Sequence, residues 1–227
     1  MTENQQDSGS IPLRSTQGDE NMKAPKKFNG IRLDKNNIKD YLSEKYNTNR
    51  MNVSLLYDST IILSDFEPLV QDDYGLAGDC AITSIAAVAQ YYFPHIVTKS
   101  CMYGIVEYYG RHFFYRGDKW GTPIPFIGII LKKSLLSFTK EKINVTSLPC
   151  KNLFAIKKQL QKSKPVILSI LNDGRNCYKN HTVTIVGYEQ FKVGKKSADF
   201  LIVYDNWDRE YHYVDYAALN LVSPIVY

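Results

Sequence analysis

Three segments of the chain carry residue types that can do chemistry together. Cys80 opens one apolar stretch, His181 opens another, and Asp205 and Asn206 directly follow a third. A thiolate is a strong nucleophile, and an imidazole can remove and return the proton of a thiol. A polar group that accepts the imidazole Nδ1–H would fix the tautomer that leaves Nε2 facing sulfur. The order of these residue types therefore indicates nucleophilic thiol chemistry.

The residues that follow Cys80 predict the helix that positions its thiol. Apolar residues recur there at helical spacing on one face, at Ile82, Ile85, Ala86 and Ala89. Asp79 directly precedes the stretch and suits an N-cap. A cysteine in a first helical turn lies among free backbone N–H groups and at the positive end of the helix dipole, which lower the pKa of a thiol. The same pattern also fits a small buried cysteine that only begins a helix.

The remaining periodic segments divide the chain into a helical half and a β half. Helical spacing predicts helices over residues 102–109, 124–136 and 151–162. Alternating or β-branched runs predict strands at 53–57, 61–63, 166–171, 181–188, 200–204 and 211–214, with a polar turn at 190–197. The expected fold class is therefore α+β, with a helical part packed on an antiparallel β-sheet. We expect the active-site cleft between the two halves, where Cys80 and His181 meet.

Length and composition favour one globular unit that carries a tail. The chain has 227 residues, of which 44% are hydrophobic and 22% charged, and these values exclude wholesale disorder and a disulfide miniprotein. Residues 1–28 are polar and are expected to form a disordered tail. Residues 29–52 are expected to form a linker or a clasp helix, and residues 53–227 the main domain.

Charge and hydropathy restrict the partners and the location of the protein. The chain has 28 Lys and Arg against 23 Asp and Glu, and this mild excess, spread along the chain, gives no reason to expect nucleic acid as a partner. It contains no apolar run long enough for a membrane span, so we expect no transmembrane segment. The N-terminal residues lack the features of a secretory signal. We therefore expect a cytoplasmic protein, or one exported without a classical signal peptide.

The other cysteines and histidines indicate neither a second nucleophile nor a metal site. No helix-start setting is predicted for the three remaining cysteines, Cys101, Cys150 and Cys177. All four cysteines are expected to be free thiols, because nothing indicates an oxidising compartment. The three remaining histidines have no cysteine or carboxylate partner at ligand spacing: His95, His112 and His212. We therefore expect no metal and no cofactor.

Taken together, the three segments resemble the papain-like cysteine peptidase superfamily, and within it the bacterial branches that include streptopain and the peptidases that process bacteriocin leaders. The resemblance rests on Gly78–Ala86, Asn180–Tyr188 and Tyr204–Trp207 and covers most of the stretch between residues 71 and 213. It implies a papain-like fold and cleavage of peptide bonds through an acyl-thioester. The implied substrate is a peptide or a protein.

Carried over by position, the resemblance makes Cys80 the nucleophile and His181 the general base and then the general acid. It makes Asp205 or Asn206 the residue that orients the imidazole. Alternation along a strand allows only one of these two side chains to face His181, and Asp205 is favoured because the papain pattern places this residue two positions before a Trp. The family usually has an oxyanion-hole Gln where this chain has Tyr74. The nearest candidate is Gln71, which an extended turn can bring back beside Cys80.

Two other functions fit the same residues. A transglutaminase-like acyl or amide transferase uses the same thioester and differs only in the acceptor. A catalytically silent papain-like module would bind a peptide in the cleft, and a displaced Gln71 would favour it. A single fast-reacting cysteine distinguishes the enzymes from the binding module.

Overall fold

The computed structural model describes residues 30–74, 78–113, 115, 121–171, 177–220 and 222–227. In this part of the chain, helices and an antiparallel sheet form the α+β fold that the sequence predicts. The helices are α1 (Ile38–Tyr46), α2 (Cys80–Tyr92), α3 (Lys99–His112), α4 (Ile124–Leu136) and α5 (Leu153–Leu160). The strands are β1 (Val53–Leu55), β2 (Ile61–Ile62), β3 (Thr146–Ser147), β4 (Val166–Ile170), β5 (His181–Val193), β6 (Lys196–Tyr204), β7 (His212–Asp215) and β8 (Val222–Val226).

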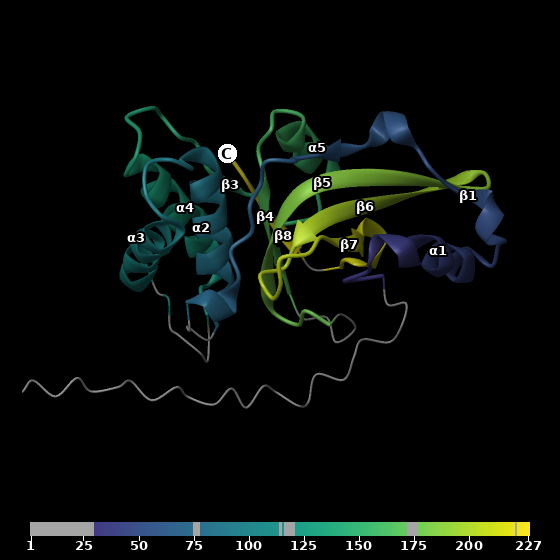
Figure 1. Ribbon diagram of the computed structural model, residues 1–227, viewed down its shortest axis with the longest axis horizontal. Coiled ribbons are helices and arrows are strands. Elements are labelled where there is room, and N and C mark those ends of the chain that lie inside the picture. The colour runs from purple at the N-terminus through teal and green to yellow at the C-terminus, as the bar shows by residue number, and fades with distance from the viewer. Residues whose placement is uncertain (1–29, 75–77, 114, 116–120, 172–176, 221) are drawn as a thin grey trace, which may run out of the picture.

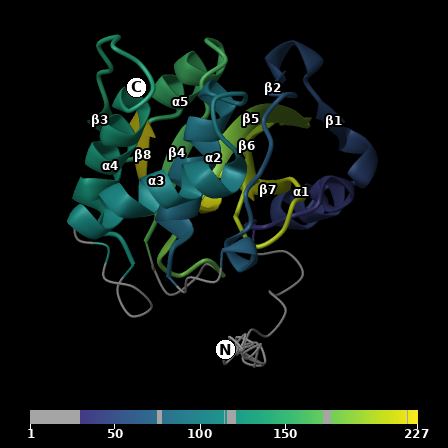
Figure 2. The same cartoon turned by 60° about the vertical axis from the view of Figure 1, so that its left-hand side comes forward.

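Helices α2, α3 and α4 form one side of the molecule and the sheet forms the other (Figure 1). Helix α2 is apolar nearly all round and is buried from Ala81 to Gln90, because it packs against α3 and α4 on one side and against β5 on the other. Figure 2 shows the same arrangement from another side. The central helix thus brings Cys80, its first residue, to the boundary between the helical part and the sheet.

The sheet runs in the order β3-β8-β4-β5-β6-β7, and β1 and β2 also pair with β5. Strands β4 to β7 are neighbours in sequence and form the expected antiparallel meander. Gly187 is required where β2 pairs with β5, since an added Cβ would lie 2.7 Å from the carbonyl oxygen of Ile61. The ladder between β5 and β6 shifts register between Ile185 and Gly187, and such a bulge increases local twist.

The segment before β1 is fastened to the sheet. Leu33 forms a two-way backbone bridge with Tyr213 of β7, and the carbonyl of Gly30 accepts the N–H of Asp215. Helix α1 buries Ile38 and Leu42 in the core. This helix lies inside the range expected to hold a linker or clasp helix, and we call residues 30–46 the clasp. The tail expected at residues 1–28 lies outside the described residues.

Several element bounds differ from those predicted. Helix α3 begins at Lys99 with Thr98 as its N-cap, and the Thr98 Oγ1 accepts the N–H of Cys101. The expectation that Cys101 has no helix-start setting was therefore wrong, because the polar residues of this first turn carry no apolar period. The polar stretch at 190–197 mostly continues β5 and β6, and β8 was missed. All four cysteines are free, as expected.

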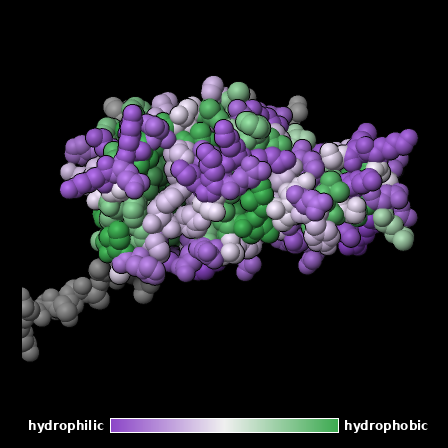
Figure 3. All heavy atoms as spheres, turned by 90° about the horizontal axis from the view of Figure 1, so that it is seen from above, coloured by the Kyte–Doolittle hydropathy of each residue, from purple (hydrophilic) through white to green (hydrophobic). Residues whose placement is uncertain are grey.

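Most apolar side chains lie in the core, so the surface is mainly polar. The face shown in Figure 3 is mostly hydrophilic, with hydrophobic side chains in separate patches. Among the described residues, no helix combines the length and hydropathy that a membrane span requires.

Candidate active site

Cys80 is the first residue of α2 and is half-buried. Asp79 occupies the N-cap position but its carboxylate accepts no backbone N–H there. It accepts hydrogen bonds from the side chains of Thr83, Tyr103 and Gln71 instead. The backbone donors of the first turn are therefore left to stabilise negative charge near the thiol.

His181 is the first residue of β5 and is 7% exposed. Its imidazole packs against the rings of Trp207, at a centroid distance of 4.6 Å, and of Tyr178, at 5.3 Å. Because α2 packs against β5, the thiol of Cys80 reaches the imidazole of His181 and the two form a hydrogen bond. The structure thus brings together two residues that are 101 positions apart in the sequence.

The two groups shift each other's pKa in opposite directions. Burial alone raises the pKa of the Cys80 thiol, but hydrogen bonding and charge from His181, together with hydrogen bonds from Thr182, outweigh burial and lower it. Burial alone lowers the pKa of His181, but the same thiol and the nearby Asp205 outweigh burial and raise it. Both shifts favour the thiolate–imidazolium form of the pair.

Asp205 lies just after β6, and its backbone rather than its side chain meets the imidazole. Its carbonyl oxygen lies 2.6 Å from Nε2 of His181. A carbonyl only accepts, so Nε2 carries the proton and Nδ1 is the nitrogen left for the thiol. The expectation that Nδ1–H is the donor to the orienting group was therefore wrong. The Asp205 carboxylate is fully buried and accepts hydrogen bonds from Arg32, Tyr178 and the N–H of Trp207.

The side chain of Asn206 links α2 to β5 through hydrogen bonds. Its Nδ2 lies 2.9 Å from the carbonyl oxygen of Thr182, 2.9 Å from Oγ of Ser84 and 3.1 Å from the carbonyl oxygen of Cys80. Its backbone adopts φ +66°, a left-handed conformation that Asn tolerates better than most residues. Its amide thus contacts the backbone on both sides of the thiol–imidazole pair.

Gln71 lies close to the nucleophile but its amide is already engaged. Nε2 donates to the carboxylate of Asp79 at 2.6 Å, and the backbone N–H donates to the carbonyl of Asn206 at 2.9 Å. Oε1 is buried and has no hydrogen-bond partner among the described residues. The Nε2 atom carries a second hydrogen, and this hydrogen is the one that can serve an oxyanion next to Cys80.

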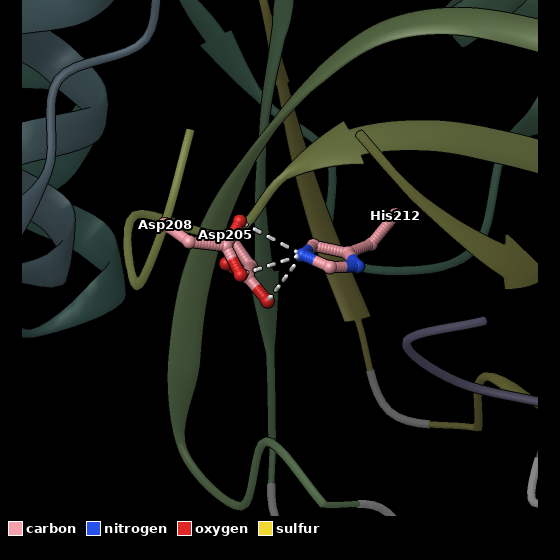
Figure 4. Close-up of side chains that lie close together, drawn as sticks. All are labelled: Asp205, Asp208 and His212. Carbon is pink, nitrogen blue, oxygen red and sulfur yellow. Dashed lines mark hydrogen bonds and ion pairs between the residues drawn. The ribbon is translucent and has the colours of Figure 1, made fainter. Parts of the chain in front are cut away.

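A group of charged residues that the sequence did not single out surrounds Asp205. Asp205 and Asp208 converge on Nε2 of His212 (Figure 4). The expectation that His212 has no carboxylate partner was wrong, because Asp208 stands four positions before it and lies 3.0 Å away. Arg32 binds both carboxylates, at 2.7 and 2.6 Å.

The side chains of Asp205, Asp208 and His212 offer ligand atoms within 4.8 Å of one another, which is a spacing that a metal ion could bridge. The guanidinium of Arg32 already supplies positive charge to the same two carboxylates. Burial raises the pKa of Asp208, but hydrogen bonds from the N–H of Glu210 and from His212, and charge from His212 and Arg32, outweigh burial and lower it. The spacing of Asp208 and His212 was a visible signal in the sequence, whereas nothing local marked Arg32.

A cysteine at a helix start that meets a histidine on an antiparallel sheet defines an α+β protein of the cysteine-peptidase type. The chain belongs to the Peptidase C39-like family, whose model matches residues 63–221, more than half of the 227 residues. This match confirms the resemblance to the papain-like superfamily. The comparison with curated proteins finds no match.

Proposed function

We propose that the protein hydrolyses peptide bonds through an acyl-thioester on Cys80. The thiolate attacks the carbonyl carbon of the scissile peptide, and the imidazolium of His181 then protonates the leaving amine. Neutral His181 next removes a proton from water, which attacks the thioester and releases the acid and the thiol. The substrate is a peptide or a protein, in agreement with the family to which the chain belongs.

The hydrogen-bonded pair of Cys80 and His181 is the observation that carries this proposal. The lowered pKa of the thiol and the raised pKa of the imidazole favour the charged pair, which is the reactive form of a thiol nucleophile. The carbonyl of Asp205 supports the role of His181, because it holds Nε2 and directs the other nitrogen to sulfur. In this proposal the backbone of Asp205, rather than its side chain, orients the base.

The oxyanion is stabilised in this proposal by the N–H of Cys80 and the free amide hydrogen of Gln71. The hydrogen bond from Gln71 to Asp79 ties this amide to the residue directly before the nucleophile. Asn206 has a different role, since its amide holds the carbonyl of Cys80 and so maintains the start of α2 against β5. Removal of one such oxyanion donor costs about 10²- to 10³-fold in kcat in other enzymes.

The test is a peptide-like electrophile that forms a thioether with cysteine, followed by mapping of the labelled residue. Cys101 serves as an internal control, because it also lies in a first helical turn, is exposed, and belongs to a different helix. We expect labelling of Cys80 alone at neutral pH, and its loss in His181→Ala. Cys80→Ala and His181→Ala should each abolish turnover of a peptide substrate. Equal labelling of Cys80 and Cys101, or turnover that survives in either variant, contradicts the proposal.

The bond between Gln71 and Asp79 favours one second candidate, a peptide-binding module without catalysis. A Gln71 amide held entirely by the carboxylate would leave the oxyanion with fewer donors. This candidate predicts that peptides bind and that an aldehyde analogue, which forms a tetrahedral thiohemiacetal with sulfur, binds no more tightly than the parent peptide.

A further inference from the structure

The buried carboxylate of Asp205 binds a cation, Arg32, that lies outside residues 63–221, the segment that matches the family. Its Oδ2 lies 2.7 Å from Nε of Arg32 and 3.2 Å from the hydroxyl of Tyr178, and its Oδ1 lies 3.1 Å from the N–H of Trp207. The carboxylate is fully buried, so its charge has no contact with water. An ionised carboxylate in such a place requires a positive partner, and the contact with Arg32 supplies it.

Arg32 also contacts two other residues of the segment that follows β6, residues 205–208. Its Nη2 lies 2.6 Å from the carboxylate of Asp208, and its guanidinium carbon lies 5.6 Å from the centre of the Trp207 ring. That ring packs against the imidazole of His181. The planar guanidinium thus binds both ends of residues 205–208 at once through two donors in a fixed fork, a geometry that the flexible ammonium of a lysine does not provide.

The backbone of the clasp is strained at this residue. Arg32 adopts φ +60°, a left-handed conformation that is strained for a residue with a side chain. The backbone bonds of Gly30 and Leu33 with β7, on either side of Arg32, hold it there. Such strain persists only where the surrounding structure enforces it, and it gathers at functional sites.

We propose that Arg32 is a positioning residue: it anchors the carboxylate of Asp205 so that the backbone carbonyl of the same residue stays on Nε2 of His181. This proposal rests on the proposed function, since it assigns Arg32 to the support of the same thiol–imidazole pair. Without the guanidinium, the buried carboxylate of Asp205 keeps the neutral donors of Tyr178 and Trp207 and the more distant imidazole of His212, 3.9 Å away, but loses its direct cationic partner, and it moves toward water together with its carbonyl. The imidazole then loses the acceptor that orients it.

The test compares Arg32→Met, which removes the charge and keeps the stem, with Arg50→Met. Arg50, which like Arg32 precedes β1 in the chain, is a matched control, because its ion pair with Asp40 is exposed. The measurement is the rate of Cys80 alkylation by iodoacetamide against pH in the full chain, with the labelled peptide quantified by mass spectrometry. We expect the midpoint of this profile to rise in Arg32→Met, with about tenfold slower alkylation below the midpoint for each unit of the rise. Arg50→Met should retain the wild-type profile.

A purely structural role for Arg32 would change stability without moving the profile. Circular dichroism and a urea unfolding midpoint therefore accompany each variant, and alkylation is measured where the fold is complete. A folded Arg32→Met protein with the wild-type profile overturns the proposal. If Arg32→Met does not fold, Arg32→Lys decides, because a flexible ammonium lacks the fixed fork that places Nε on Asp205 and Nη2 on Asp208, and the midpoint must rise by a smaller amount. An unchanged midpoint in folded Arg32→Lys then overturns the proposal.

Peptide turnover separates this inference from the proposed function. A wild-type protein that cleaves no peptide, with a midpoint that rises in Arg32→Met, rejects the peptidase and retains the positioning role. Turnover that depends on Cys80, with a midpoint independent of Arg32, retains the peptidase and rejects the positioning role.

Discussion

Replacing Asn206 by Asp tests the contact that joins the helical part to the sheet. Asp has nearly the same shape as Asn and is also favoured at a left-handed φ such as the +66° found here. The change therefore replaces two amide hydrogens by at most one carboxyl hydrogen and leaves the backbone geometry in place. It also turns an oxygen toward the carbonyls of Cys80 and Thr182, which now accept from Nδ2.

The magnitude follows from the number of hydrogens and from burial. Asn206 is 1% exposed, and its two amide hydrogens contribute about 1 kcal/mol each to the free energy of unfolding. A carboxyl group at this position must stay protonated in the folded state, so its pKa is raised above the unfolded value of about 3.9. The folded state then binds more protons than the unfolded state, and stability falls as the pH rises. The added loss is about 1.4 kcal/mol per pH unit, from the unfolded pKa up to the folded one.

Urea unfolding of Asn206→Asp and the wild type, at intervals between about pH 4 and pH 7, measures this loss. Other titrating groups cancel in the difference between the two proteins. Asn47→Asp is the matched control, because Asn47 is exposed and also adopts a left-handed φ, of +47°. We expect the Asn206→Asp difference to grow with pH and the Asn47→Asp difference to stay nearly constant. A pH-independent difference for Asn206→Asp would refute the reasoning.

Three further predictions concern the groups around this contact. Peptide turnover should follow a bell-shaped pH profile, whose acid limb reports the lowered pKa of Cys80 and whose alkaline limb the raised pKa of His181. In His181→Ala, the alkylation midpoint of Cys80 should rise toward that of an ordinary thiol, and an unchanged midpoint would show that the imidazole does not stabilise the thiolate. Tyr103→Phe removes a donor to the buried carboxylate of Asp79 and should lower the free energy of unfolding by about 1.5–3 kcal/mol in urea titrations. Tyr109→Phe, in which an exposed bond is lost, should cost less, and equal losses would contradict the role of burial.

The helix of Cys80 and the strand of His181 could be predicted because both produce a strong local signal. Helix α2 repeats apolar residues at helical spacing, and β5 begins at His181 with a continuous buried run. Because α2 belongs to the helical part and β5 to the sheet, their first residues were expected on opposite sides of the boundary between these two parts. Local periodicity was enough to find the pair because each residue stands at the first position of its element.

The group that meets the imidazole could not be predicted from the same rules. Strand alternation requires an extended backbone, and β6 ends at Tyr204, one residue before the turn. The left-handed φ of Asn206 then reverses the chain, so the choice between two side chain faces does not apply, and a carbonyl accepts the Nε2 proton. Arg32 was missed for a different reason: it contacts Asp205 across 173 positions, and a single long-range ion pair leaves no periodic pattern.

The turn at residues 205–207 explains how so few contacts hold the whole site. Its first carbonyl meets His181, its second accepts the N–H of Gln71, and the amide of Asn206 holds the carbonyl of Cys80. The proposed nucleophile, base and oxyanion donor therefore share one short segment as their common support. A displacement of this segment moves all three groups together, so residues that hold it act on the reaction as a unit rather than separately. Through residues 205–207, the clasp, which lies outside residues 63–221, can affect the reactivity of the Cys80 thiol.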